Sequence, residues 1–125
     1  MVLHNNFSDF VLFLYIHMAL ADHYLHPVEE EVILGKMSKL FPTEANPKQK
    51  FDAELARYKS FDHETAMTII RDTFKQFSSV DFSQKYKVYT DLYDVINADG
   101  KVEESEKIVL EALKEIIDIN AEVKN

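Results

Sequence analysis

The sequence has no cysteine and no tryptophan, and it has only two glycines and three prolines in 125 residues. The lack of cysteine excludes disulfides, thiolate nucleophiles and cysteine-ligated zinc, and it fits a reducing compartment. So few helix-breaking residues favour helices joined by short turns over a sheet protein. Glycine-rich phosphate loops and Gly-x-Ser-x-Gly elbows are also missing, so we expect that the protein is not an enzyme.

Basic residues are few as well. Fourteen lysines and arginines stand against 22 acidic residues, which gives a formal net charge of −8. A nucleic-acid-binding surface needs clustered cations, so we expect no nucleic-acid partner. The apolar run from Phe10 to Ala21, interrupted by His17, is shorter than the roughly 20 residues that span a bilayer. We therefore expect a cytoplasmic protein without direct membrane insertion.

The apolar content indicates a folded helical domain. Hydrophobic residues make up 46% of the chain, including nine phenylalanines and six tyrosines. The first helix is predicted to run from Asn6 or Ser8 to about Asp22. Because it is apolar on nearly all sides, it should lie in the middle of the bundle. His17 falls within it, and we expect a core histidine that is hydrogen-bonded to a neighbour.

Capping signals predict five further helices. The expected start signals are Pro27 for the second helix, Asn46 with Pro47 for the third, Asp62 for the fourth, Asp81 or Ser83 for the fifth and Glu103 for the sixth. No stretch reads as a strand. The predicted fold class is therefore all-α, a compact bundle of six to seven helices that residues 1–125 form as a single domain.

One motif occurs twice. Residues 21–33 read ADHYLHPVEEEVI, and residues 97–110 read NADGKVEESEKIVL. In each copy a long apolar helix leads into a tight acidic turn and then into the next helix. The aligned pairs are Ala21 with Ala98, Asp22 with Asp99, Leu25 with Val102, Glu29 with Glu106 and Ile33 with Leu110. The repeat predicts two pseudo-symmetric helix–turn–helix units that pack against each other.

The acidic turns have two interpretations. An EF-hand loop built on Gly100 would need an oxygen ligand at Val95, which cannot coordinate, so a true EF-hand is not expected. Turn architecture explains the same residues, because Gly100 can end a helix, Asp99 can hydrogen-bond turn amides and Glu106 can cap the sixth helix. Ion binding and turn architecture both stay open at this point.

Two histidines near the first turn offer another metal chemistry. His23 and His26 are close to Asp22 and Glu29, so a zinc or nickel site is chemically allowed. A turn does not fix the directions of its side chains as a helix would, and histidines that flank a turn are more often solvated. The solvated state is therefore the expected one.

The repeated pattern Ala-Asp-x-x-[Leu/Val]-x-x-x-Glu resembles the TerB-like family, the tellurite-resistance group, and the N-terminal domain of DjlA-type co-chaperones. The resemblance extends from Phe7 to Ile117, and each copy of the pattern follows an apolar helix. The second copy, with Gly100, is close to the family pattern. The first copy departs from it, because His23 stands where glycine is usual.

The resemblance implies that residues 1–125 form a non-enzymatic TerB-like helical module with links to bacterial stress response and membrane-associated complexes. It also implies acidic residues that bind a divalent cation, with Ca²⁺, Mg²⁺ or Mn²⁺ favoured over Zn²⁺. The implied metal positions are Asp22, Glu29, Asp99 and Glu106.

The alternative function is a protein–protein interaction module, similar to a co-chaperone, whose acidic turns are only structural. Its motivation is a set of aromatic residues larger than a small core obviously needs: Phe74 and Phe77 on the fourth helix, and Tyr86, Tyr89 and Tyr93 on the fifth. Core packing is the commoner explanation of such stripes. If the rings formed an exposed, self-complementary patch, they would bind a protein partner or a second copy in a twofold homodimer.

Overall fold

The protein is described by a computed structural model that covers residues 6–22, 25–43, 45–76, 82–98 and 104–123. Its described part is helical and contains no strand, which confirms the predicted all-α class. The elements are α1 (Phe7–Ala19), the short 3₁₀ helix η1 (Leu20–Asp22), α2 (Pro27–Leu40), α3 (Pro47–Lys59), α4 (His63–Gln76), α5 (Phe82–Ile96) and α6 (Glu104–Val123).

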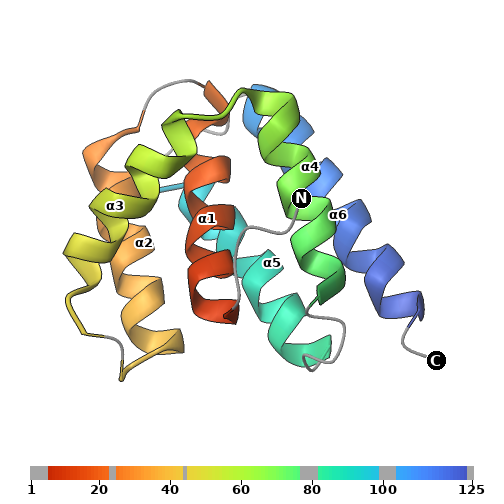
Figure 1. Cartoon of the computed structure of the whole chain (residues 1–125), viewed down its shortest axis with the longest axis horizontal. Coiled ribbons are helices and arrows are strands. Elements are labelled where there is room, and N and C mark those ends of the chain that lie inside the picture. The colour runs from red at the N-terminus through yellow and green to blue at the C-terminus, as the bar shows by residue number, and fades with distance from the viewer. Residues whose placement is uncertain (1–5, 23–24, 44, 77–81, 99–103, 124–125) are drawn as a thin grey trace.

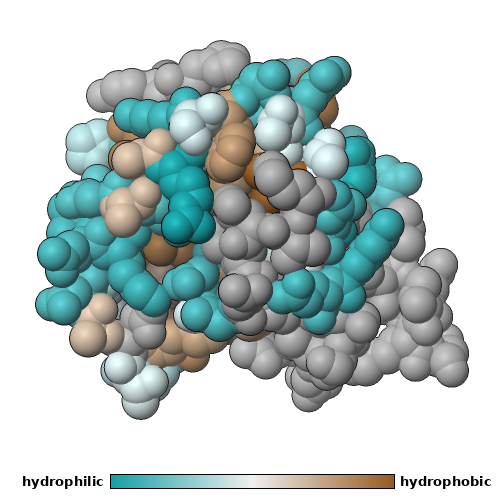
Figure 2. Space-filling view, viewed as in Figure 1, coloured by the Kyte–Doolittle hydropathy of each residue, from teal (hydrophilic) through white to brown (hydrophobic). Residues whose placement is uncertain are grey.

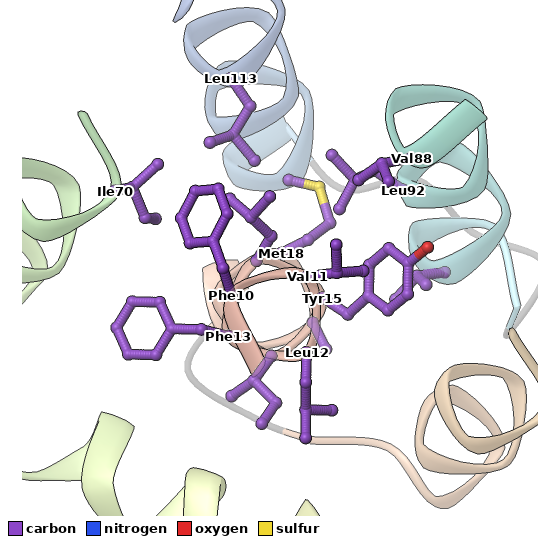
Figure 3. Packing of buried hydrophobic residues seen from close by; sticks show 14 of the residues in the cluster. Phe10, Val11, Leu12, Phe13, Tyr15, Met18, Ile70, Val88, Leu92 and Leu113 are labelled. Atoms are coloured by element: carbon purple, nitrogen blue, oxygen red, sulfur yellow. The ribbon is translucent and has the colours of Figure 1, made fainter. Parts of the chain in front are cut away.

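Helix α1 is the axis of the bundle, as its all-round apolar sequence predicted. It packs against each of the other five α-helices. Figure 3 looks along α1 and shows its side chains pointing outward in several directions toward the surrounding helices. Every residue from Phe10 to Ala19 is buried, His17 included. The free energy that stabilises the fold therefore comes largely from covering this one helix with apolar surface.

The predicted helix starts are confirmed at most positions. Asn6 caps α1, since the backbone amide of Asp9 donates a hydrogen bond of 2.9 Å to its side-chain oxygen. Asp62 caps α4 in the same way, with a bond of 2.7 Å from the amide of Thr65. Pro27 is the first residue of α2, where its fixed φ suits the helix and its missing N–H is no loss.

Two predicted caps differ from the structure. Asn46 precedes Pro47 as expected, but it adopts the left-handed conformation (φ 54°) and makes no side-chain capping bond. Asparagine tolerates this conformation better than most residues do. Ser83 lies inside α5 and so does not cap it, while Asp81 lies outside the described residues.

The helices form two hairpins with two covering helices (Figure 1). The α1–α2 and α5–α6 hairpins meet where α1 packs directly on α5. Helix α3 covers α1 and α2, whereas α4 covers α1 and α6. The face shown in Figure 2 is mostly hydrophilic where it is coloured, with apolar residues largely recessed between polar ones. In the part of the chain that the structure describes, no helix has the length and apolar character of a membrane span.

Candidate functional site

The first acidic turn begins where α1 tightens into η1. Asp22 is the last residue of η1, and its side chain lies outside the described part of the structure, as do His23 and Tyr24. The chain is described again at Leu25 and His26, which are half-buried. His26 is extended (φ −78°, ψ 140°) and precedes Pro27, the first residue of α2. The turn is therefore closed by a short extended segment ahead of the next helix.

Glu29 is built into this turn. It is the third residue of α2 and is 0% exposed. The backbone amide of His26 donates a hydrogen bond of 2.9 Å to its Oε1, and the amide of Glu29 donates one of 2.9 Å to the carbonyl of His26. A carboxylate here also interacts favourably with the positive end of the helix dipole. Glu29 thus has the capping role that the structural interpretation predicted for Glu106, its counterpart in the second copy of the repeat.

The second acidic turn reproduces this arrangement in the residues that are described. Helix α5 ends at Ile96, and the amide of Ala98 bonds back to the carbonyl of Val95 at 3.3 Å. Residues 99–103, including Asp99 and Gly100, lie outside the described residues. Helix α6 then starts at Glu104, so Glu106 is its third residue, and Glu106 is 1% exposed.

The described members of the repeat have matching environments. Glu29 and Glu106 occupy the third position of α2 and α6, and both are buried. Ala21 and Ala98 are both half-buried, while Ile33 and Leu110 both belong to the core. A buried glutamate is rare unless its charge is satisfied, so its occurrence at both equivalent positions is not accidental. The sequence repeat is therefore a structural repeat.

The described segments that flank the two turns lie at the same end of the bundle. The 3₁₀ helix η1 packs against α6, although 81 positions separate Asp22 from Glu103 along the chain. Figure 1 shows η1 beside the first turns of α6, at the end of the molecule where α3 passes into α4. The fold thus places the 3₁₀ helix that leads into the first turn against the helix that follows the second turn.

The donor set of these turns fits a hard divalent cation in its chemistry. Carboxylate oxygens are the ligands that Ca²⁺, Mg²⁺ and Mn²⁺ prefer. Among the residues whose side chains are described, no three acidic or histidine side chains come together as a metal-binding group. Glu29 and Glu106 are described, whereas the Asp22 and Asp99 side chains are not. A three-ligand site at the turns would therefore need at least one ligand from outside the described side chains, and Asp22 and Asp99 are the candidates that the repeat offers.

The family follows from a comparison of the sequence with protein-family models. The model of the tellurite resistance protein TerB matches residues 9–123, which is nearly the whole chain. The chain belongs to the TerB family. Comparisons with curated proteins and with solved structures gave no significant match. The expected TerB resemblance is thus confirmed at the level of the family and its all-helical fold.

This TerB protein also contains a cluster of charged side chains around a buried aspartate, which the sequence did not reveal. Asp91 of α5 is 1% exposed, and its Oδ2 accepts a hydrogen bond of 3.3 Å from the Tyr15 hydroxyl of α1. Its Oδ1 lies 2.9 Å from the Lys87 Nζ and 3.2 Å from the Lys36 Nζ of α2. Lys36 also bonds Asp94 at 2.6 Å. The cluster ties α1, α2 and α5 together. The sequence signal was the spacing of Asp91, three residues after Val88 and four before Val95, which places it on the buried side of α5.

The histidine inside α1 belongs to a second polar cluster of this TerB chain. His17 is 0% exposed, and its Nδ1 shares a hydrogen bond of 2.8 Å with the Tyr58 hydroxyl of α3. Its ring stacks on His63 of α4, with centroids 5.2 Å apart. Burial, and secondarily the nearby His63, lower the pKa of His17 to about 3. The expectation of a hydrogen-bonded core histidine is confirmed, and its partners are Tyr58 and His63.

Proposed function

We propose that this chain is a non-enzymatic TerB module of a stress response that binds a divalent cation through its paired acidic turns. The packing of η1 against α6 carries the proposal, because it supports a shared location for the two turns. The buried glutamates at equivalent positions add support, since each holds negative charge at the start of a helix beside its turn.

The residues of the turns would have different roles in binding the cation. Asp22 and Asp99 would supply ligand oxygens, one from each turn, and Glu106 would add a buried carboxylate. Glu29 already holds the first turn through the amide of His26, so it would keep the turn in shape as well as contribute charge. Oxygen donors favour Ca²⁺, Mg²⁺ or Mn²⁺, whereas Zn²⁺ prefers nitrogen and sulfur. The bound cation would offset part of the net charge of −8.

Calorimetric titration of chelator-treated protein with Ca²⁺, Mg²⁺, Mn²⁺ and Zn²⁺ tests this proposal. We expect one of the oxygen-preferring cations to bind and to raise the melting temperature, because a ligand of the native state stabilises it by mass action. The double variant Asp99→Asn, Glu106→Gln should bind that cation at least about tenfold more weakly, which corresponds to about 1.4 kcal/mol.

The matched control is Glu111→Gln, Glu115→Gln, which removes two negative charges from exposed positions of α6. It should leave the affinity unchanged within about twofold, because it changes net charge but no turn. Circular dichroism shows whether the double variant still folds, since it changes the buried Glu106. If it does not fold, the single variant Asp99→Asn replaces it in the titration. Equal cation affinity in the parent and in the turn variants would contradict the proposal.

The exposed tyrosines of α5 favour a second candidate function, association with another protein. Tyr86 and Tyr93 are each 51% exposed, seven residues apart on one side of the helix. Tyr89 lies between them, half-buried, with its ring centroid 6.0 Å from that of Tyr86. Phe74 is only 3% exposed and packs in the core, so it does not extend this tyrosine stripe, while Phe77 lies outside the described residues.

The simplest partner for the tyrosine stripe is a second copy of the chain. Sedimentation should then show a dimer that dissociates in the double variant Tyr86→Ser, Tyr93→Ser. The free energy of unfolding of the monomer should change by less than about 0.5 kcal/mol per site, since both rings are half exposed. A parent protein that sediments as a monomer at several hundred micromolar would exclude the homodimer.

A further inference from the structure

The solvent-facing side of α5 has an aromatic edge and a charged edge that run side by side. The aromatic edge is the tyrosine stripe, in which Tyr86 and Tyr93 are each 51% exposed. The charged edge holds Lys87 and Asp94, whose side chains are 56% and 58% exposed. The members of each pair are two helical turns apart, so each pair keeps to one line along the helix. Thr90, which is exposed, lies between the two edges.

This side of α5 is electrically balanced, as far as its side chains are described. Its exposed residues carry one positive charge, on Lys87, and one negative charge, on Asp94. The whole chain has a net charge of −8, so two copies repel each other wherever their acidic surfaces meet. A balanced face with exposed rings lets two copies approach without that local repulsion. The charges of α5 therefore favour a second copy of the chain as the partner of this face.

We propose that two copies of the chain pair through α5 in antiparallel orientation, about a twofold axis that passes beside Thr90. The inference rests on the association proposed above for the tyrosine stripe and specifies its geometry. In this orientation Lys87 of each copy faces Asp94 of the other, so two ion pairs form across the axis. Tyr86 of one copy and Tyr93 of the other then lie within about 3 Å of the same level along the helices.

The same charges disfavour a parallel pairing of the two faces. A parallel pair would place the two Lys87 side chains together and the two Asp94 side chains together, and like charges repel. The contacts within each chain are compatible with the antiparallel pair. Lys87 lies 2.9 Å from the buried Asp91. Because Asp91 also contacts Tyr15 and Lys36, Lys87 can turn toward the second copy without leaving that carboxylate unpaired.

Sedimentation of charge-reversal variants tests the orientation. Lys87→Glu and Asp94→Lys should each dimerise at least about tenfold more weakly than the parent, because each brings two pairs of like charges together. An equimolar mixture of the two variants should recover the dissociation constant of the parent within about threefold, since opposite charges then face each other. The matched controls Lys59→Glu and Asp52→Lys make the same charge changes at exposed positions of α3 and should leave the dimer unchanged.

Cross-linking tests the same orientation with milder substitutions, in case a reversed charge beside Asp91 or Lys36 prevents folding. The chain has no cysteine, so each introduced thiol is the only one in its protein. Under mild oxidation, Lys87→Cys and Asp94→Cys proteins should form covalent dimers at least about tenfold faster when mixed than either does alone, because facing thiols have a high effective concentration.

The outcomes separate this inference from the association on which it rests. If the parent stays monomeric at several hundred micromolar, both fail. If the parent dimerises and Tyr86→Ser, Tyr93→Ser dissociates it, but mixing the charge-reversed variants does not restore the dimer, only the antiparallel geometry is overturned. Faster cross-linking of Lys87→Cys or Asp94→Cys alone than in the mixture would overturn it in the same way.

Discussion

An Asp91→Ala protein should lose about 3 kcal/mol of unfolding free energy, because the substitution removes a buried carboxylate that Tyr15 and two lysines share. The buried phenol of Tyr15 would lose its acceptor, and the ammonium groups of Lys36 and Lys87, which are 21% and 56% exposed, would each lose an ion-pair partner. Urea unfolding at pH 7 measures the effect. The dependence of the unfolding free energy on urea concentration should be equal in the parent and the variant, so that a changed midpoint reports a changed stability.

The size of the effect follows from the exposure of the partners. Tyr15 is 0% exposed, and a buried hydroxyl left without an acceptor costs roughly 1–3 kcal/mol. Burial, together with the charge of Asp91, raises the pKa of Tyr15 well above its ordinary value, so the hydroxyl stays protonated and needs an acceptor. The Lys36 side chain is 21% exposed and retains Asp94, so its share of the loss is smaller.

Asp94 provides the matched control. It lies three residues after Asp91 on the same helix and contacts the same lysine at 2.6 Å, but its side chain is 58% exposed. Asp94→Ala should therefore cost only about 0.5 kcal/mol, as surface ion pairs do. Equal losses of unfolding free energy from the two alanine substitutions would show that the burial of Asp91 does not determine how much it stabilises the fold.

Acidification should destabilise the protein through His17, by about 2 kcal/mol between pH 7.5 and pH 5. Folding lowers the pKa of this histidine to about 3 from an ordinary value of about 6.5. Below pH 6.5 the unfolded chain therefore binds a proton that the native protein does not. The stabilisation is complete above pH 6.5 and is lost progressively as the pH falls toward 3.

The His17→Gln variant isolates this contribution. Below pH 6.5 the parent's unfolding free energy should fall with pH more steeply than the variant's, by about 1.4 kcal/mol per pH unit. Subtracting the two curves cancels the acidic groups that both proteins share. The imidazole proton shifts of His17 should also stay constant down to pH 5. Titration of His17 near pH 6.5 in the folded protein would contradict this account.

Helix boundaries were predictable because their signals are local. Asn6 and Asp62 cap helices through bonds to amides three residues away, and Pro27 fixes its own φ, so no distant contact is needed to place these ends. Asn46 shows the limit of such signals. The residue type fits a cap, but its left-handed backbone takes it out of the geometry in which the side chain would cap α3.

The buried clusters were harder to predict because their partners come from distant helices. The spacing along α5 can place Asp91 on the buried side, but nothing local identifies Tyr15 and Lys36 as its partners. The position of His17 did predict a buried, hydrogen-bonded side chain, but nothing local identifies Tyr58 and His63 as its neighbours. Residues that meet only in the tertiary structure leave no periodic pattern in the sequence.

The acidic turns were predictable in part, unlike the buried clusters, whose partners were not predicted. The repeat predicted that Glu29 and Glu106 are equivalent, and both are buried third residues of their helices. It did not predict that η1 packs against α6, because that contact depends on how the two hairpins are arranged. The equivalence of the two glutamates is therefore a sequence property, whereas the contact between η1 and α6 is a property of the fold.

The central position of α1 has a consequence for synthesis on the ribosome. Helix α1 precedes all five helices that cover it, and α6, one of those helices, is the last to be made. During translation the apolar surface of α1 must wait for about 100 further residues, roughly 5–20 s, until α6 is complete. Nascent chains of this architecture should therefore depend on transient shielding by a chaperone more than a bundle whose early helices cover one another.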